Sequence, residues 1–436
     1  MSLKASYGFN PRQIVAAIAA SVALLSAGCV RRGGPRQVGN RVPAITLWYG
    51  ANETAGAVGN PQPWFNVLGN VSDAPDLATL SYSLNGRPVR MLAIGPFSVP
   101  PDSPGCPASG ARGWRGKIAL LWNTCRAEPA SWRCLGRHIW DRARNASPFR
   151  KKIVYPRRLY RVGDFNVEID RDVLHNGRNR LELIASGRDE KRLAAASVTI
   201  NYTKGRVWPL PFVVDWSRVS RISDAAQIVD GRWAKTPAGL RTVSMGYDRV
   251  FAIGDVKWTN YEVTARITIH AIDSAAYNLI STAPGIGMVL HWRGHSFSPV
   301  PQCECSQPRC GWLPWGAYGL YDFGIGRFEI NDPTRTIAKS PPRKLDFNAT
   351  WIWKMRVEDL PHRGPYYSMK VWRQGSPEPV EWDLRGMGEP ESLTSGSIAF
   401  DAHHVDATFG DITIVPGPFT NKGGRIQQVR SENLAR

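Results

Sequence analysis

The densest group of side chains suited to proton transfer lies at residues 291–295, His291-Trp292-Arg293-Gly294-His295, and Tyr318 and Tyr321 follow within thirty residues. A His or Tyr side chain can act as a general base, and an Arg can neutralise the carboxylate of a uronate. In an enzyme, His291, Arg293, His295 and Tyr321 would carry a lyase reaction. The alternative is that His291 and Arg293 lie on a solvated strand face and His295 in a loop.

An aromatic segment rich in Gly and Pro follows at residues 311–321 (GWLPWGAYGLY). Sugar rings stack their apolar faces on Trp and Tyr, while neighbouring polar groups bind the hydroxyls. The alternative is that these aromatic side chains fill the core between two sheets, and both interpretations stay open for Trp312 and Trp315. The candidate glycan-binding residues are Trp292, Arg293, Trp312, Trp315, Tyr318 and Tyr321.

Seven cysteines bear on the compartment and on metal binding. Setting Cys29 aside leaves two groups of three, Cys106, Cys125 and Cys134, and Cys303, Cys305 and Cys310. Zinc binding by the second group with His295 is an alternative, but CxC spacing with a distant His is a weak zinc signal. A disulfide within 303–310, or free thiols, is favoured over zinc, and we predict no metal site.

The elements that must position these groups are strands. Residues 261–270 alternate strictly, with Tyr261, Val263 and Ile267 on one face. Trp351 and Trp353 alternate inward in the same way and are predicted to be core. Further strands are expected at 286–293, 351–358, 366–372, 397–402 and 408–415. So many long strands between residues 204 and 416 predict a jelly roll of two curved sheets.

Residues 44–203 predict a smaller sandwich. Short strands are expected at 45–49, 64–71, 80–84, 164–170, 181–184 and 198–202. Asn85-Gly86 marks a hairpin turn, and Phe165, Val167 and Ile169 share one strand face. This pattern suits an immunoglobulin-like sandwich. A basic insertion at 97–158, without strand pattern, interrupts it.

The first residues predict export. Lys4 and Arg12 precede an apolar run at 14–25, which is too short to span a bilayer and suits a signal peptide. The run ends in Leu25-Ser26-Ala27-Gly28-Cys29, which resembles the lipobox of bacterial lipoproteins. That resemblance makes residues 1–29 a lipoprotein signal peptide and Cys29 the lipidated residue. Residues 30–43 are predicted to be a flexible tether, and 417–436 a disordered tail.

The formal charge of +19 is unevenly distributed. Residues 101–158 hold thirteen Lys or Arg against three acids, so they supply ten of the nineteen charges. The rest of the chain is mildly basic and carries no nucleic-acid-binding signature, so we expect no nucleic-acid partner. A basic exported surface favours acidic polysaccharide, wall polymers or anionic lipid as partners.

Several segments carry a family resemblance. They are Ile253-Gly254-Asp255, Gly285-Ile286-Gly287-Met288, residues 353–357, residues 367–372, and residues 403–412. Together they resemble the concanavalin A-like lectin/glucanase superfamily in its laminin-G-like form. Residues 44–415 as a whole resemble uncharacterised secreted bacterial proteins that join an immunoglobulin-like unit to this jelly roll. The expected fold is therefore all-β, an immunoglobulin-like sandwich followed by a concanavalin A-like jelly roll.

This resemblance implies several activities, because superfamily members bind glycans, hydrolyse them, cleave them as lyases or bind proteins. Its glucanases carry paired acids in an E-x-D-x-x-E strand. Glu378, Glu381 and Asp383 lie in a Pro-rich stretch, and Glu329 with Asp332 has the wrong spacing. Calcium is a cofactor by family analogy only, since Asp406 or Asp411 falls far short of the six to eight oxygens that calcium takes.

The sequence favours an exported, membrane-anchored lipoprotein of the cell envelope whose jelly roll binds carbohydrate, without a cofactor. One alternative is a polysaccharide-degrading lyase or hydrolase that uses the residues from His291 to His295. Another is a structural or adhesive protein whose surface binds a second protein.

Overall fold

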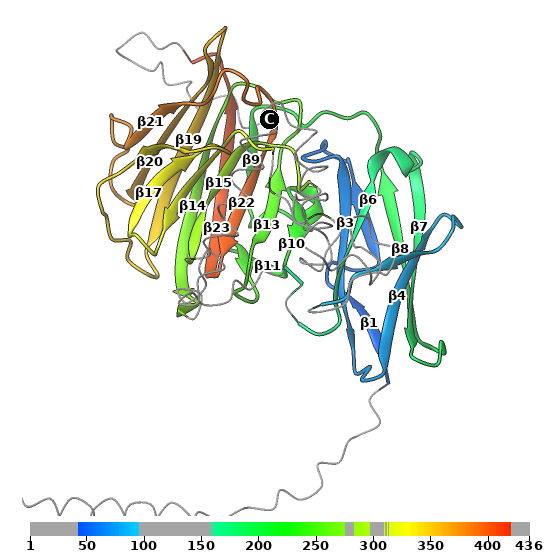
Figure 1. Cartoon of the computed structure of the whole chain (residues 1–436). Helices are drawn as coiled ribbons and strands as arrows, with labels where there is room; N and C mark the ends of the chain where they lie inside the picture. Colours follow the sequence, from blue (N-terminus) through cyan, green and yellow to red (C-terminus); the bar gives the residue numbers. More distant parts are fainter. Residues whose placement is uncertain are drawn as a thin grey trace, which may run out of the picture. The chain divides into compact units, whose positions relative to one another are not determined.

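The computed structural model describes residues 42–95, 158–159, 161–274, 283–296, 309, 312 and 314–419. Cys29, the other six cysteines, the predicted leader, nearly all of the basic insertion and the tail from 420 onward lie outside these ranges. The expected all-β class is confirmed: the described ranges contain 23 strands and two short 3-10 helices, η1 (Arg171–Val173) and η2 (Ile222–Asp224) (Figure 1). No helix within them is long and apolar enough to cross a membrane.

Strands β1 to β8 form the first sandwich. Its smaller sheet has the order β1 (Ala44–Leu47), β3 (Trp64–Ser72), β6 (Asp164–Asp170). Its larger sheet has the order β2 (Asn52–Ala55), β8 (Arg192–Tyr202), β7 (Gly177–Gly187), β4 (Leu77–Leu84), β5 (Arg90–Leu92). All pairs are antiparallel except β2 with β8. That this sandwich is immunoglobulin-like remains a prediction from the sequence.

Alternation along β6 builds the core of this sandwich. Phe165, Val167 and Ile169 point inward, as predicted, and are at most 3% exposed. The predicted turn follows β4 directly, where Asn85 and Gly86 have φ of 52° and 70°. Glycine adopts such angles without strain, and Asn tolerates them, so the pair closes this turn.

The polar face of β3 and β6 is buried as well, against the second sandwich. Asn166 Nδ2 donates to the carbonyl of Val229 at 3.0 Å, and Gln227 Nε2 donates to that of Trp64 at 3.0 Å. Buried polar groups are stable only when hydrogen-bonded, and these bonds meet that need across the contact. The first sandwich therefore contacts the second through a polar interface.

Strands β9 to β23 form the second sandwich. Its seven-stranded sheet has the order β10 (Gln227–Asp230), β13 (Arg249–Ile253), β22 (Ser397–His403), β15 (Gly285–Trp292), β16 (Ala317–Asp322), β17 (Arg327–Asn331), β18 (Thr336–Lys339). Its eight-stranded sheet has the order β11 (Trp233–Thr236), β12 (Gly239–Thr242), β23 (Val405–Pro416), β14 (Tyr261–Ile272), β19 (Thr350–Leu360), β20 (Gly364–Arg373), β21 (Leu384–Met387), and β9 (Phe212–Val214) also pairs with β23.

The inward faces of these two sheets make one large apolar core. Trp351 and Trp353 belong to it, as predicted, and Phe251 stacks on Phe400 with ring centroids 4.7 Å apart. Since strands alternate, the other side of the seven-stranded sheet is a separate surface. A second, smaller apolar cluster lies on that outer face, around Val289 and Trp292.

Candidate functional site

A bulge in β15 decides which way the side chains of the 291–295 segment point. Pairing with β22 shifts register between Leu290 and Trp292, and His291 has φ of 51°. Bulges re-aim side chains at strand ends. Here the bulge directs His291 toward the core side of the sheet and Trp292 toward the outer face.

His291 joins two loops. Its ring nitrogens lie 2.8 Å from the carbonyl oxygens of Leu393 and Thr259, and its ring packs edge-on against Tyr261. Burial lowers the His291 pKa, while the two carbonyl oxygens oppose that shift. Neither His291 nor His295 lies on a solvated face, since both are fully buried.

Five of the residues singled out from the sequence meet on the outer face. The His295 ring lies edge-on between two indoles, with its centroid 5.7 Å from that of Trp292 and 4.7 Å from that of Trp312. The Trp312 ring packs edge-on against Trp315, with centroids 6.0 Å apart, and lies parallel to Tyr318, with centroids 6.5 Å apart. Trp312, Trp315 and Tyr318 are half-buried, so parts of three rings reach the surface.

Three ionisable groups from two strand ends lie beside these rings. Asp401 and His403 sit two apart on β22, and Asp248 precedes β13, which pairs with β22. His403 Nδ1 is 2.7 Å from Asp248 Oδ1, and Tyr318 donates its hydroxyl proton to Asp401 Oδ2 at 2.8 Å. Trp312 Nε1 also donates to Asp248 Oδ2, at 2.8 Å. The rings and the acids therefore form one network.

The two carboxyl groups of this network differ in charge. Burial, together with the nearby Asp248, raises the pKa of Asp401 to about 8. Burial also opposes ionisation of Asp248, but Arg158 and the hydrogen bonds from His403 and Trp312 outweigh it and lower the Asp248 pKa. Burial lowers the His403 pKa, yet Asp248 outweighs burial and raises it. At neutral pH Asp401 therefore holds its proton while Asp248 is ionised.

Arg158 provides positive charge in this network. Its guanidinium lies 3.1 Å from Asp248 Oδ2 and 3.4 Å from Asp230 Oδ2, and all three side chains are nearly inaccessible. His295 Nε2 lies 2.7 Å from the same Asp230 oxygen. We call the whole group the outer-face cluster: Arg158, Asp230, Asp248, Trp292, His295, Trp312, Trp315, Tyr318, Asp401 and His403.

Three buried polar atoms of the outer-face cluster have no hydrogen-bond partner in the part of the chain that the structure describes. They are Asp401 Oδ1, Trp292 Nε1 and Trp315 Nε1. Buried polar atoms are nearly always hydrogen-bonded, so one carboxyl oxygen and two indole nitrogens without a partner are exceptions. All three atoms are inaccessible to solvent, so they do not face the surface.

Two residues from the sequence prediction lie elsewhere. Tyr321 is on the opposite face of β16 from Tyr318, in the core, where it donates to the Arg343 carbonyl at 2.8 Å. Arg293 donates to the Ser395 side chain at 2.6 Å and to its carbonyl at 3.0 Å. The four groups named for a lyase, His291, Arg293, His295 and Tyr321, are therefore not gathered at one place.

Asp248, Asp401 and His403 could each direct one ligand atom at a metal ion, with these atoms within 4.8 Å of one another. Arg158, however, already places a positive charge 3.1 Å from Asp248. Three ligand atoms also fall short of the six to eight oxygens of a calcium site. The cluster therefore does not fit calcium. The Arg158 guanidinium already supplies the positive charge that a metal ion would bring.

Asp406 and Asp411 lie outside this cluster. Asp406 pairs with Arg241 at 2.8 Å and Asp411 with Arg266 at 2.8 Å. His403 and His404 do not point to opposite faces of a strand, because β22 ends at His403 and His404 turns with φ of 56°. The two rings consequently lie 4.7 Å apart, edge to face.

Sequence reasoning did not find Asp248, Asp401 or Arg158. Asp401 lies on the strand predicted at 397–402, and His403 directly follows that strand, so alternation could have placed Asp401 on the outer face. No sequence pattern near Asp248 indicates a functional site. Asp248 lies in the cluster because strands more than 150 residues apart in the sequence pair with each other.

No protein-family model and no curated protein matches the chain. Among solved structures, the exoplasmic/lumenal domain of VIP36, bound to Ca²⁺ and Man3GlcNAc, matches with 9% identity and a TM-score of 0.33, over 48% of this chain and 92% of that one. The potassium-bound carbohydrate recognition domain of Emp46p matches with 11% identity and a TM-score of 0.29, over 47% and 96%. A protein of unknown function with a galectin-like fold from Bacillus subtilis matches with 14% identity and a TM-score of 0.31, over 47% and 94%. At these values any function rests on the residues of this chain.

Proposed function

We propose that the protein binds carbohydrate at the outer-face cluster of the seven-stranded sheet. The observation that carries the proposal is the meeting of three half-buried aromatic side chains, Trp312, Trp315 and Tyr318, the first and last of which are fixed by hydrogen bonds to buried carboxyl groups. One face of a sugar ring is apolar and stacks on Trp and Tyr side chains.

The roles of the residues follow from their chemistry. Trp312, Trp315 and Tyr318 would stack on sugar rings. Asp401 is 2% exposed, so it would hold Tyr318 in place through the hydrogen bond between them. Asp248 is saturated by Arg158, His403 and Trp312, so it would hold Trp312 in place instead of contacting the ligand.

Gly287 supports this arrangement beneath Tyr318. A Cβ added at Gly287 would lie 2.8 Å from the Tyr318 ring and 2.2 Å from the Gly319 carbonyl oxygen. Only glycine therefore lets the Tyr318 ring lie this close to β15.

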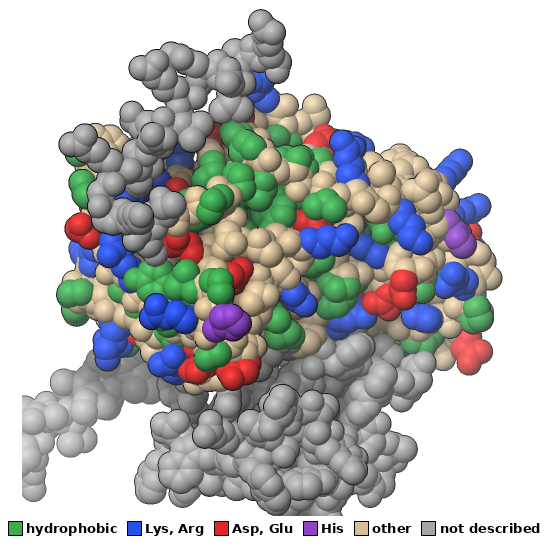
Figure 2. All heavy atoms as spheres, turned by 90° about the horizontal axis from the view of Figure 1, so that it is seen from above, with side chains coloured by type: hydrophobic (Ala, Val, Ile, Leu, Met, Phe, Trp, Pro, Cys, Tyr) green, Lys and Arg blue, Asp and Glu red, His purple; other side chains and the backbone are tan. Residues whose placement is uncertain are grey.

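The proposal extends to an exported lipoprotein of the cell envelope, anchored through lipid on Cys29. The support is the sequence of the leader, with its basic start, its apolar run at 14–25 and its lipobox-like ending. On the face drawn in Figure 2, basic and acidic side chains are interspersed, which agrees with a partner other than nucleic acid at that face. Metabolic labelling with a radioactive fatty acid should mark the wild type and leave Cys29→Ala unlabelled.

A glycan array probed with the whole chain tests carbohydrate binding. We expect a restricted set of glycans to bind, and Trp312→Ala or Trp315→Ala to weaken binding at least about tenfold, the equivalent of 1.4 kcal/mol. The control is Trp372→Ala on β20, outside the outer-face cluster. If no glycan binds, or if the control weakens binding as much, the proposal is wrong. Assaying each bound polysaccharide for soluble product would separate binding from cleavage.

A further inference from the structure

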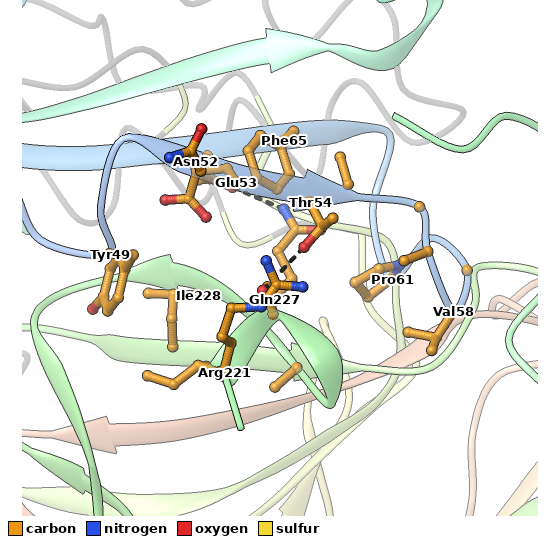
Figure 3. A pocket seen from close by; sticks show the side chains of 18 of the residues that line it. Tyr49, Asn52, Glu53, Thr54, Val58, Pro61, Phe65, Arg221, Gln227 and Ile228 are labelled. Carbon is orange, nitrogen blue, oxygen red and sulfur yellow. Dashed lines mark hydrogen bonds between the residues drawn. The ribbon is translucent and has the colours of Figure 1, made fainter. Parts of the chain in front are cut away.

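A cavity separate from the outer-face cluster lies where the two sandwiches meet. Its volume is about 290 Å³. Tyr49, Glu53 and Phe65 line it from the first sandwich, while Arg221 and Ile228 face them from the second (Figure 3). Thr54 Oγ1 bonds to Ser223 Oγ across it at 3.1 Å, so both sandwiches hold the cavity in shape.

Glu53 is the unusual residue of this cavity. It is 8% exposed, yet no hydrogen bond or ion pair to its carboxylate occurs among the described residues. Burial raises the Glu53 pKa to about 8, against the weaker opposing effect of Arg221. Ionising a buried carboxyl group that has no partner costs free energy. Glu53 therefore holds a proton at neutral pH.

Aromatic side chains supply much of the remaining wall. Trp48 and Tyr49 are half-buried at its edge, and Phe65 and Trp208 are 5% and 3% exposed. Aromatic faces attract cations, most strongly where water is excluded, and a carboxylate completes such a site through charge-assisted hydrogen bonds.

We propose that this cavity binds a small ligand through a protonated amine, with Glu53 as its counter-ion. The ligand ammonium would lie beside the Glu53 carboxylate and against the aromatic wall. A cavity of this size, close to the lower end of ordinary ligand pockets, admits a single sugar or amino-acid-sized molecule. This site is independent of the proposed carbohydrate site on the outer face.

The other charged groups around Glu53 permit such a ligand. Arg221 is committed to Asp224, with Nη2 2.8 Å from Oδ1. Lys235 lines the cavity from β11 but is exposed, and Tyr49 is neutral because burial raises its pKa. Binding of an ammonium would therefore ionise Glu53, and the complex would release about one proton at pH 7.

Calorimetry with glucosamine and N-acetylglucosamine as matched probes tests the proposal on the whole chain at pH 7. We expect glucosamine to bind at millimolar concentration with release of about one proton, counted by comparing phosphate and Tris buffers. N-acetylglucosamine lacks the ammonium and should bind this cavity at least about tenfold more weakly. Glu53→Gln should abolish glucosamine binding, and Gln replaces the neutral form of Glu53 closely enough to fold.

The control variants separate this site from the outer-face cluster. Glu182→Gln, on β7 and paired with Arg180, should bind glucosamine like the wild type. Trp312→Ala should also bind glucosamine normally, because Trp312 belongs to the other site. No binding of glucosamine, equal binding of both probes, binding without proton release, or an unaffected Glu53→Gln variant would each overturn the proposal.

Discussion

Two groups of charged residues on the outer faces of the second sandwich differ in their exposure. On β12, β14 and β23 of the eight-stranded sheet, charges pair across strands near solvent, as in Arg266 with Asp411 and Arg241 with Asp406. On the seven-stranded sheet Arg158, Asp248 and Asp401 are each less than 5% exposed, and the pKa of Asp401 is raised to about 8. Exposed pairs are worth little, whereas buried charges must be compensated at high cost. The difference locates the candidate site on the seven-stranded face.

Removing one cation from each face should give the largest difference between the two groups of charges. Arg158→Met would leave Asp230 and Asp248 buried with less compensation, at a cost of about 3–5 kcal/mol in the free energy of unfolding. Arg266→Met, on the exposed face, should cost about 1 kcal/mol or less. Urea unfolding midpoints at pH 7 measure both. Equal effects of the two substitutions would show that the faces do not differ in this way.

A smaller effect concerns pH. The pKa of Asp401 is raised to about 8 from its ordinary value of 3.8, so the folded state keeps a proton that the unfolded chain loses above pH 4. The stability that neutral Asp401 contributes is complete below about pH 4 and is lost as pH rises through 8. Asp401→Asn cannot ionise, so its thermal midpoint should fall less than the wild-type midpoint between pH 5 and pH 9. Asp411→Asn, on the other face, should keep the wild-type slope, and an unchanged slope in Asp401→Asn would contradict the assignment.

The smallest effect is expected at the rim of the eight-stranded sheet. Arg241 is half exposed and pairs with Asp406 through two nitrogens. Arg241→Gln should lower the unfolding free energy by about 0.2–1 kcal/mol and leave glycan binding unchanged. Loss of glycan binding in this variant would indicate that the binding site lies on the eight-stranded sheet and not on the seven-stranded sheet.

Alternation along the chain predicted most of the strands, because one buried face imposes a period of two on each of them. It also placed Trp351, Trp353 and Phe165 correctly in the two cores. The bulge at His291 could not be predicted, because it depends on how β22 pairs with β15, and it sends His291 and Trp292 in directions that simple alternation does not give.

The candidate site was predictable only in part. Trp312, Trp315 and Tyr318 stood out as aromatic residues among Gly and Pro, and the structure brings them together. Asp248 and Asp401 could not be identified as site residues from the sequence. They are 153 positions apart, and only the pairing of two distant strands brings them together. Tyr321 carried the same local signal as Tyr318, but one residue type on one strand can face either way.

The strand order has a consequence for how the chain reaches its native state during synthesis. β22 lies between β13 and β15, and β23 lies between β12 and β14, so both sheets of the second sandwich have as an inner strand one of the last two strands that the structure describes. The seven-stranded sheet cannot close before residue 403 has left the ribosome, nor the eight-stranded sheet before residue 416. Until then the earlier strands lack their neighbours and expose unpaired edges, which invite aggregation. The second sandwich therefore stays open until its last strands are made, and chaperones have that interval in which to bind it.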